Sequence, residues 1–539
     1  MLRERCINII YLSIMRTLIN TITDKLNLET NINNISVIDS IKMELNSETV
    51  MSILKKYKNP TKMEKYIIKI HTSKEENIKS ILSNNYFENL LSLVYFTIGN
   101  PFSIDTPFFE SIYNNFTIIS KIPEYIINQY NIIINDKKIS KFYNIDIIER
   151  WVETIMSKPV KKQEYFKVSN SKDKNINWNK YCIVWKEFNK NCLELKKYLP
   201  TLVKYYKSIK YNKVVGCYNI SKELYLHCIR SHTGLDIENS HINIMEKWAF
   251  KELAMLQKKM NGYIEEITHK KCNNIVATLK SISKTQAFSS KKEYIDTYQK
   301  CIDKYEKLFI EKFKLPQYIK PTLVVFSNKN LGHAYYNENC FYLNCYNWKK
   351  SYKYTVESLV LHESVPGHHT QVHVTKYIEK KDTLLLSYFS SIVNSFVEGW
   401  GLWSEKLGYN QTTWDKIGQV EFETFRTLRI IVDIRLHYKG YTPQEMIVFM
   451  SKYLGMDKHE ITNEVYRYVC LPGQAMSYKI GCTFFKKLLE KTHNKQFESI
   501  DLLDTKSINL YKKIILDGPK PLYFLLKEYG IKMSSLFES

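Results

Sequence analysis

The sequence lacks the patterns that mark secreted and membrane proteins. Its eleven cysteines include no C-x-x-C pair, and an odd number without a regular framework favours free thiols in a reducing compartment. No apolar stretch approaches the roughly 20 residues of a membrane-spanning helix. Arg16 interrupts an apolar run near the N-terminus before the core of a signal peptide is complete. We therefore expect a soluble, cytoplasmic protein without a membrane partner.

Patterns typical of nucleic-acid binding are also missing. The net charge of +23 could attract nucleic acid, acidic peptides or anionic membranes. However, the lysines are scattered along the chain, and there is no arginine-rich arm, zinc knuckle or RNA-recognition signature. Glycine and proline are scarce whereas Ile, Asn, Lys and Tyr are abundant, a bias that indicates an AT-rich genome rather than a special fold. A solvated basic surface is favoured over a dedicated nucleic-acid site.

What is present predicts a mainly α protein with a small β element. The 539 residues can bury a large core. Residues 1–200 are predicted to form an N-terminal helical region with irregular linkers, continuous with a second helical region at 201–539. Short strands are expected at 322–326 and 340–345, and nearly all of the chain after residue 356 is expected to be helical.

The most informative segment is HESVPGHH, residues 362–369. Without its Pro-Gly pair it would match His-Glu-x-x-His, the zinc-hydrolase motif in which two imidazoles lie one turn apart and the glutamate acts as general base. In an unbroken helix His368 would lie about 240° round from His362, and His369 about 10 Å further along the axis. The pair Pro366–Gly367 removes an amide donor and permits unusual backbone angles, so a break there can return His368 to His362.

This motif predicts a zinc site together with its general base. His362 and His368 are the first two ligands, in preference to core or capping histidines. Glu363 would take a proton from zinc-bound water, whose pKa the metal lowers to roughly 7. His369 either replaces His368 as a ligand or lies outside the ligands and orients one of them; we favour the second role.

Three further segments follow the motif. They are FVEGWGLWSE at 396–405, RIIVDIRLH at 429–437 and RYVCLPGQAMSYKIG at 467–481. With HESVPGHH they resemble domain-of-unknown-function family 885, a large and mostly bacterial family of proposed zinc peptidases, over roughly residues 210–539. The family pattern differs where Trp403, Ile434-Arg435 and Glu246 stand, but none of these is a predicted ligand. A more distant similarity, to thimet oligopeptidase and carboxypeptidase Taq, implies a helical metallopeptidase-like fold around a deep channel.

Glu398 is predicted to be the third metal ligand, an assignment that draws partly on the resemblance. Two histidines and one glutamate leave the fourth zinc position open for water, which is the arrangement of catalytic sites. Glu405 lies seven residues later on the same helix face. It is an alternative ligand, but we favour a role in which it holds a ligating histidine through the second ring nitrogen.

Arg429, Asp433 and His437 form a stripe at i, i+4 and i+8. The residues between them are mostly apolar, so the helix is predicted to be buried and its charged groups to need partners. We interpret Arg429 and Asp433 as supports around the site. His437 is either a transition-state donor or a purely structural residue.

The last matched segment supplies candidates for oxyanion and substrate binding. Tyr478 and, less strongly, Tyr468 are expected to stabilise the oxyanion with a hydroxyl group. Arg467, Gln474 and Lys479 could hold the C-terminal carboxylate of a substrate by charge-assisted hydrogen bonds, although Arg467 could equally be a structural ion-pair partner.

Together these residues predict a zinc metallopeptidase that hydrolyses short peptides, with residues 201–539 as its catalytic region. Glu363 would activate the zinc-bound water and later protonate the leaving amine. The strand at 340–345 would lie beside the zinc-binding helix, where a peptide could add as another strand. Two alternatives remain: a zinc amidohydrolase that acts on a small molecule, and a basic nucleic-acid-binding or structural protein with a decayed site.

Overall fold

The computed structural model describes residues 222–538, apart from 316–317, 328–332, 338 and 379–389, together with scattered positions at 62–66 and 186–204. The chain divides into two compact units, one of which contains Tyr218–Ser539. The N-terminal helical region predicted for residues 1–200 lies almost wholly outside the described residues.

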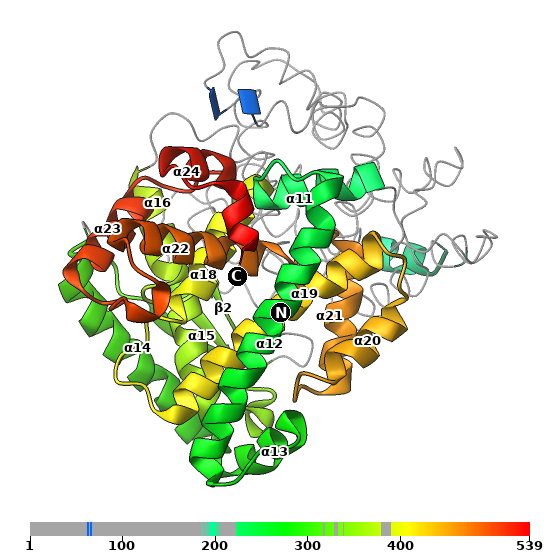
Figure 1. Ribbon diagram of the computed structural model, residues 1–539. Helices are drawn as coiled ribbons and strands as arrows, with labels where there is room; N and C mark the ends of the chain where they lie inside the picture. The colour runs from blue at the N-terminus through cyan, green and yellow to red at the C-terminus, as the bar shows by residue number, and fades with distance from the viewer. Residues whose placement is uncertain are drawn as a thin grey trace. The chain divides into compact units, whose positions relative to one another are not determined.

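The described part of this unit is mainly α-helical, as predicted (Figure 1). Its helices are α11 (Lys222–Thr233), α12 (Asn239–Thr268), α13 (Ile275–Ile282), α14 (Lys291–Phe313), α15 (Val356–Glu363), α16 (His368–Ile378), α18 (Asn394–Ser404), α19 (Thr413–His437), α20 (Pro443–Ser451), α21 (Lys458–Cys470), α22 (Ser477–His493), α23 (Thr505–Leu516) and α24 (Leu522–Glu528). The long helices α12 and α19 pack against each other, and α18 packs against α22. Among these described helices, none is both long and apolar enough to cross a membrane.

The small β element is a sheet with β3 in its centre. The strands are β1 (Thr322–Phe326), β2 (Ala334–Asn337) and β3 (Cys340–Asn344), in the order β1-β3-β2. β3 runs parallel to β1 and antiparallel to β2. Both predicted strands are present, whereas β2 was not predicted because its four residues alternate too little in polarity. β2 contacts α15 and α16, so it is the strand next to these two helices.

Helices α18 and α22 cross with their backbones in contact. A Cβ atom added to Gly399 would lie 2.4 Å from the Cα of Gly481, and one added to Gly481 would lie 1.7 Å from the carbonyl oxygen of Ser395. Only glycine fits on both sides of this crossing. The contact brings the first turn of α22, which carries Tyr478, against the turn of α18 that carries Glu398.

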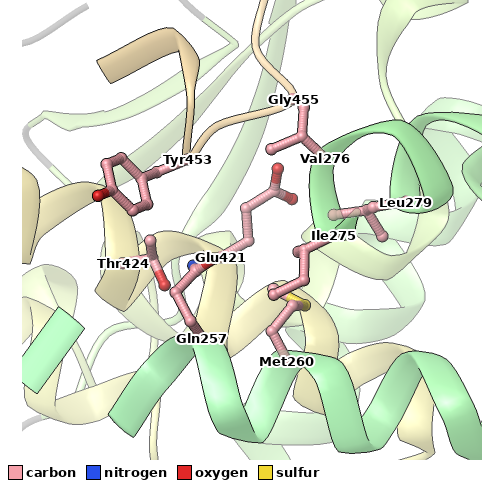
Figure 2. A pocket seen from close by; sticks show the side chains of 9 residues that line it. All are labelled: Gln257, Met260, Ile275, Val276, Leu279, Glu421, Thr424, Tyr453 and Gly455. Carbon is pink, nitrogen blue, oxygen red and sulfur yellow. The ribbon is translucent and has the colours of Figure 1, made fainter. Parts of the chain in front are cut away.

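A small cavity between α12, α13 and α19 contains a carboxyl group (Figure 2). The cavity measures about 10 Å³, roughly the room that one water molecule needs. Its apolar wall includes Met260, Ile275 and Leu279, and the side chain of Glu421 points into it. Burial raises the pKa of Glu421 to about 7.

We expect Glu421→Gln to stabilise the protein at about pH 8 and to have little effect at about pH 5. A carboxyl group with a raised pKa binds more protons in the folded state than in the unfolded state. The free energy of unfolding is therefore highest below the ordinary pKa of a glutamate, and it falls as the pH rises through about 7. Glutamine cannot ionise, so it should gain roughly 1–3 kcal/mol at the higher pH. Urea denaturation at both pH values measures the change.

The same substitution at the exposed Glu311 on α14 serves as the control and should alter stability at neither pH. An equal effect of Glu421→Gln at both pH values would show that ionisation is not the cause.

Candidate metal centre

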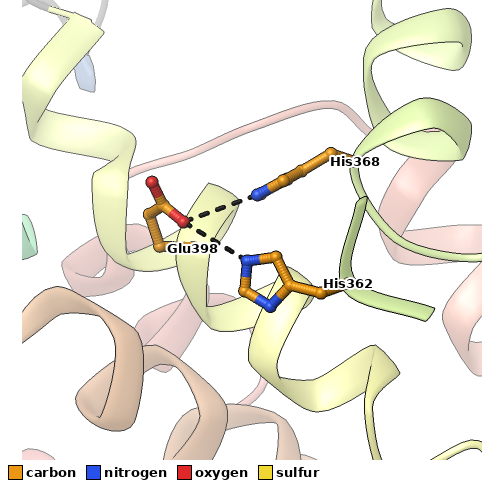
Figure 3. Close-up of side chains that lie close together, drawn as sticks. All are labelled: His362, His368 and Glu398. Atoms are coloured by element: carbon orange, nitrogen blue, oxygen red, sulfur yellow. Dashed lines mark ion pairs between the residues drawn. The ribbon is translucent and has the colours of Figure 1, made fainter. Parts of the chain in front are cut away.

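Three buried side chains meet at one point: His362 from α15, His368 from α16 and Glu398 from α18 (Figure 3). The Nε2 atoms of the two histidines lie 3.7 and 3.4 Å from Oε2 of Glu398. One potential ligand atom from each residue lies within 4.8 Å of the others. Two imidazoles and one carboxylate at this spacing are the donor set of a catalytic zinc site.

A break in the helix brings His368 back to His362. α15 ends one residue after His362 and α16 begins at His368, as the pair Pro366–Gly367 predicted. A Cβ atom on Gly367 would lie 2.1 Å from the carbonyl oxygen of His362, so only glycine lets the chain fold back this closely. The indole N–H of Trp400 donates a hydrogen bond of 2.8 Å to the carbonyl of the proline and ties the break to α18.

Gly401 makes room for both imidazole rings. It follows Glu398 by one turn of α18, and a Cβ atom there would lie 2.8 Å from Nε2 of His362 and 3.0 Å from Cε1 of His368. The two rings are nearly perpendicular, with centroids 4.8 Å apart. A larger residue at this position would push the histidines away from the carboxylate.

Glu405 contacts His362 at the ring nitrogen that faces away from the cluster. Its carboxylate lies 2.7 Å from Nδ1 of His362, and the guanidinium of Arg426 lies 3.8 Å from the same carboxylate. A hydrogen bond at Nδ1 leaves Nε2 to face Glu398. This geometry favours the orienting role for Glu405 over the alternative role as a ligand.

The donor atoms of the cluster could hold a metal ion. Nε2 of His362 is buried and makes no hydrogen bond within the part of the chain that the structure describes. A buried polar atom without a partner costs about 1–3 kcal/mol, a cost that a bound metal ion would remove. The residues that would hold the ion are His362, His368 and Glu398.

Glu363 is the last residue of α15, and its side chain faces the edge of the sheet at β2. Its side chain is buried, and its Oε2 accepts a hydrogen bond of 3.2 Å from the backbone N–H of Tyr336 in β2. Glu363 follows the clustered His362 directly in the sequence. The carboxylate is therefore held against β2, and its place next to His362 in the sequence agrees with the expected role of general base.

His369 points away from the cluster. Its Nε2 lies 2.7 Å from the carbonyl oxygen of Ile319. Its ring packs against the rings of Tyr318, Tyr336 and His373. These contacts match neither predicted role, as a ligand or as the orienting partner of one. His369 follows His368 by about 100° of helix rotation, so its side chain leaves α16 in a different direction. Its contact with Ile319 links α16 to the segment before β1.

Of the two candidate tyrosines, Tyr478 is the one beside the cluster. Its buried ring stacks on that of His362 with centroids 6.5 Å apart. The hydroxyl of Tyr468 instead accepts a hydrogen bond from Arg429 and donates one of 3.0 Å to Glu464. Tyr478 is therefore better placed than Tyr468 to stabilise an oxyanion.

The charged stripe on α19 does not act as one unit. The guanidinium carbon of Arg429 lies 4.5 Å from the centroid of the Tyr478 ring, a contact that agrees with a supporting role. Asp433 lies one turn further on and accepts hydrogen bonds from the hydroxyl of Tyr225 at 2.6 Å and the N–H of Gly473 at 3.0 Å. Burial raises the pKa of Asp433 to about 7. Asp433 thus fixes the Pro-Gly turn before α22.

The sequence leaves the role of His437 open between a transition-state donor and a structural residue. Its Nε2 lies 2.9 Å from the carbonyl oxygen of Tyr468, and its ring packs against Tyr225. Eight residues of helix place it about 12 Å beyond Arg429 along α19. The structural alternative is the one that these contacts support.

Lys479 is not available to a substrate, which contradicts its predicted role. Its ammonium group lies 2.8 Å from Glu252 and 2.6 Å from Glu423, so it links α12, α19 and α22. Arg467 donates a hydrogen bond of 2.7 Å to Gln474 and pairs with Glu464 at 3.0 Å. The ion-pair role that was the alternative for Arg467 is therefore present.

Four residues of the site were missed from the sequence. Gly401 could have been found from its place one turn after Glu398. Tyr336 acts through its backbone N–H, which no side-chain motif reveals. Arg426 and Glu464 each lie three residues before a predicted site residue, a spacing that places neighbours on one helix face.

The fold and site define a mainly helical protein with a buried His-His-Glu cluster. The chain belongs to the family described as bacterial protein of unknown function (DUF885), whose model matches residues 186–504. The resemblance noted in the sequence is thereby confirmed at the level of the family. No curated protein matches the chain.

Two solved structures show a similar fold. One is a "putative lipoprotein" from Colwellia psychrerythraea, with a TM-score of 0.67 and 15% identity over 92% of this chain and 90% of that one. The other is a "putative lipoprotein of unknown function" from Shewanella oneidensis, with a TM-score of 0.55 and 14% identity over 95% and 98% of the two chains. At these identities the likeness concerns the fold alone.

Proposed function

We propose that the protein is a zinc-dependent peptidase that hydrolyses short peptides. The observation that carries the proposal is the buried cluster of His362, His368 and Glu398. Glu363, the next residue after His362, is also buried and is hydrogen-bonded to β2. When bound, zinc would supply a Lewis acid that polarises a carbonyl group and lowers the pKa of a water molecule to about 7.

The chain's own residues supply the proton transfers. Glu363 would accept a proton from water at the cluster and return it to the amine that leaves. The N–H of Tyr336 holds one oxygen of that carboxylate and so fixes its direction. Glu405 keeps the ring of His362 in its orientation. Tyr478, stacked on that ring, would donate its hydroxyl to the oxygen on which negative charge develops.

Strand β2 offers an edge along which a peptide would bind. Within the described residues β2 pairs with β3 on one side only, and the N–H of Tyr336 is directed at Glu363 instead of at β3. A peptide added at this edge would pass Glu363 with its own backbone hydrogen-bonded. The strand at 340–345, which the sequence favoured for this role, is central and already paired on both sides.

We expect about one zinc ion per chain, and cleavage of short peptides that depends on it. Elemental analysis measures the metal, and mass spectrometry of a peptide mixture detects cleavage. A chelator should abolish cleavage, and added zinc should restore it. The His362→Ala variant should lose both metal and activity.

Cleavage by zinc-free protein would contradict the proposal. Zinc-loaded protein that cleaves no peptide would favour the amidohydrolase alternative.

A further inference from the structure

We propose that Arg429 and Arg467 form a subsite for the free α-carboxylate of the peptide, so that cleavage falls close to the C-terminus. This inference rests on the proposed peptidase function and adds the class of substrate. Two carboxylates already engage Lys479, so the subsite uses Arg429 instead, which lies against the ring of Tyr478.

The first observation is an excess of buried positive charge. The guanidinium groups of Arg426, Arg429 and Arg467 belong to residues that are 7%, 0% and 3% exposed. Arg429 and Arg467 share one carboxylate, that of Glu464, at 3.3 and 3.0 Å. Arg426 has a partner of its own in Glu405, at 3.8 Å. Arg429 and Arg467 are thus two cations that share one anion, and buried charges need partners.

Neighbouring groups do not remove this excess. Asp433 is the further acid that Arg467 influences, but burial raises its pKa to about 7, so it is only partly ionised near neutral pH. In contrast, the two arginines lower the pKa of Glu464 to about 2, so this group carries its negative charge near neutral pH. The carboxylate of a substrate would neutralise the remaining positive charge.

The second observation is a hydrogen-bond donor that is not used. Nε of Arg429 donates to the hydroxyl of Tyr468 at 3.1 Å, and Nη2 donates to Glu464 at 3.3 Å. Nη1 is buried and has no hydrogen-bond partner among the described residues. A carboxylate oxygen is the acceptor that binds such a donor most strongly.

The third observation is the distance to the cluster. The guanidinium carbon of Arg429 lies 4.5 Å from the centroid of the Tyr478 ring, which lies 6.5 Å from that of His362. Arg429 is therefore within about 11 Å of the His362 ring. An extended peptide spans roughly 3.3–3.6 Å per residue. A carboxylate held at Arg429 would place a bond one to three residues from the C-terminus at the cluster.

The test compares a blocked tripeptide that has a free C-terminal carboxylate with the same tripeptide as its C-terminal amide. For the wild-type protein we expect the acid to be preferred by about tenfold or more in kcat/KM. Arg429→Gln should bring the ratio to about one while zinc content stays unchanged. A merely structural role would lower both rates and keep their ratio.

Arg435→Gln is the matched control. Arg435 lies on the same helix but pairs with Glu246 at 3.1 Å, so this variant should keep the wild-type ratio. If Arg429→Gln does not fold, Arg467→Lys provides the second variant, since lysine keeps the charge but loses the planar fork, and should reduce the preference. Equal rates for acid and amide in the wild type would overturn the subsite and leave the peptidase proposal intact.

If neither tripeptide is cleaved, calorimetry with the zinc-loaded wild type separates the two proposals. Tighter binding of the acid that is lost in Arg429→Gln would support the subsite although the proposed hydrolysis fails. Equal binding of acid and amide would overturn the subsite.

Discussion

Replacing Glu363 with glutamine is expected to lower peptide hydrolysis by roughly 10²- to 10⁴-fold while the metal stays bound. The Glu363 carboxylate is not one of the three clustered groups, and its Oε2 accepts a hydrogen bond from the N–H of Tyr336. Glutamine has nearly the same volume, so it removes the proton acceptor without leaving a cavity. The loss should therefore appear in kcat, with zinc content by elemental analysis equal to that of the wild type.

Glu357→Gln is a suitable control for this variant. Glu357 is a buried glutamate on the same helix, but it pairs with Lys304 at 3.0 Å and hydrogen-bonds to Gln411, so its loss should spare both metal and kcat. A Glu363→Gln protein that holds zinc and cleaves peptides at close to the wild-type rate would show that another group accepts the proton.

The meeting of His362 and His368 could be predicted because the two residues follow local spacing rules, whereas the assignment of Glu398 drew partly on the family resemblance. A Pro-Gly pair directly before His368, in a segment that starts with His-Glu, has few structural explanations, and ideal helix geometry already required a break before His368. The helical fold was predictable for a similar reason, since long amphipathic segments such as α12 and α19 are periodic in the sequence. The break and the mainly α architecture were both found.

The surroundings of the cluster could not be predicted because they depend on how helices pack. Tyr478 and Lys479 are adjacent in one matched segment, yet about 100° of helix rotation separates them. Tyr478 consequently stacks on His362, whereas Lys479 meets Glu252 and Glu423 on another side of α22. The crossing of α18 and α22 at their glycines sets which of the two faces the site, and this contact is not visible in either segment alone.

Spacing in the sequence also did not show how far each residue of the α19 stripe lies from the site along the helix axis. The sequence predicts that Arg429 supports the site, and it leaves His437 open between a transition-state donor and a structural residue. The eight residues between them span about 12 Å, which is longer than the cluster itself. Arg429 reaches Tyr478, and His437 instead binds the carbonyl of Tyr468.

Glu398→Gln and Glu405→Gln should separate a metal ligand from the group that orients one. Both glutamates are buried, at 2% and 0% exposure, and only seven residues apart, so general damage to the fold should be similar. Oε2 of Glu398 lies 3.7 and 3.4 Å from the two histidine Nε2 atoms. Glutamine cannot replace that negative charge, so Glu398→Gln should lose zinc during purification.

Glu405 would affect metal binding only through His362, because its carboxylate lies 2.7 Å from Nδ1 of that residue. Glu405→Gln should therefore still bind zinc, with an affinity about 10- to 100-fold weaker, as expected when the partner of a ligating histidine is changed. Competition with a chromophoric chelator measures both affinities. Full zinc in Glu398→Gln together with loss in Glu405→Gln would transfer the third ligand position to Glu405. Full zinc in both variants would mean that His362 and His368 hold the ion without either carboxylate.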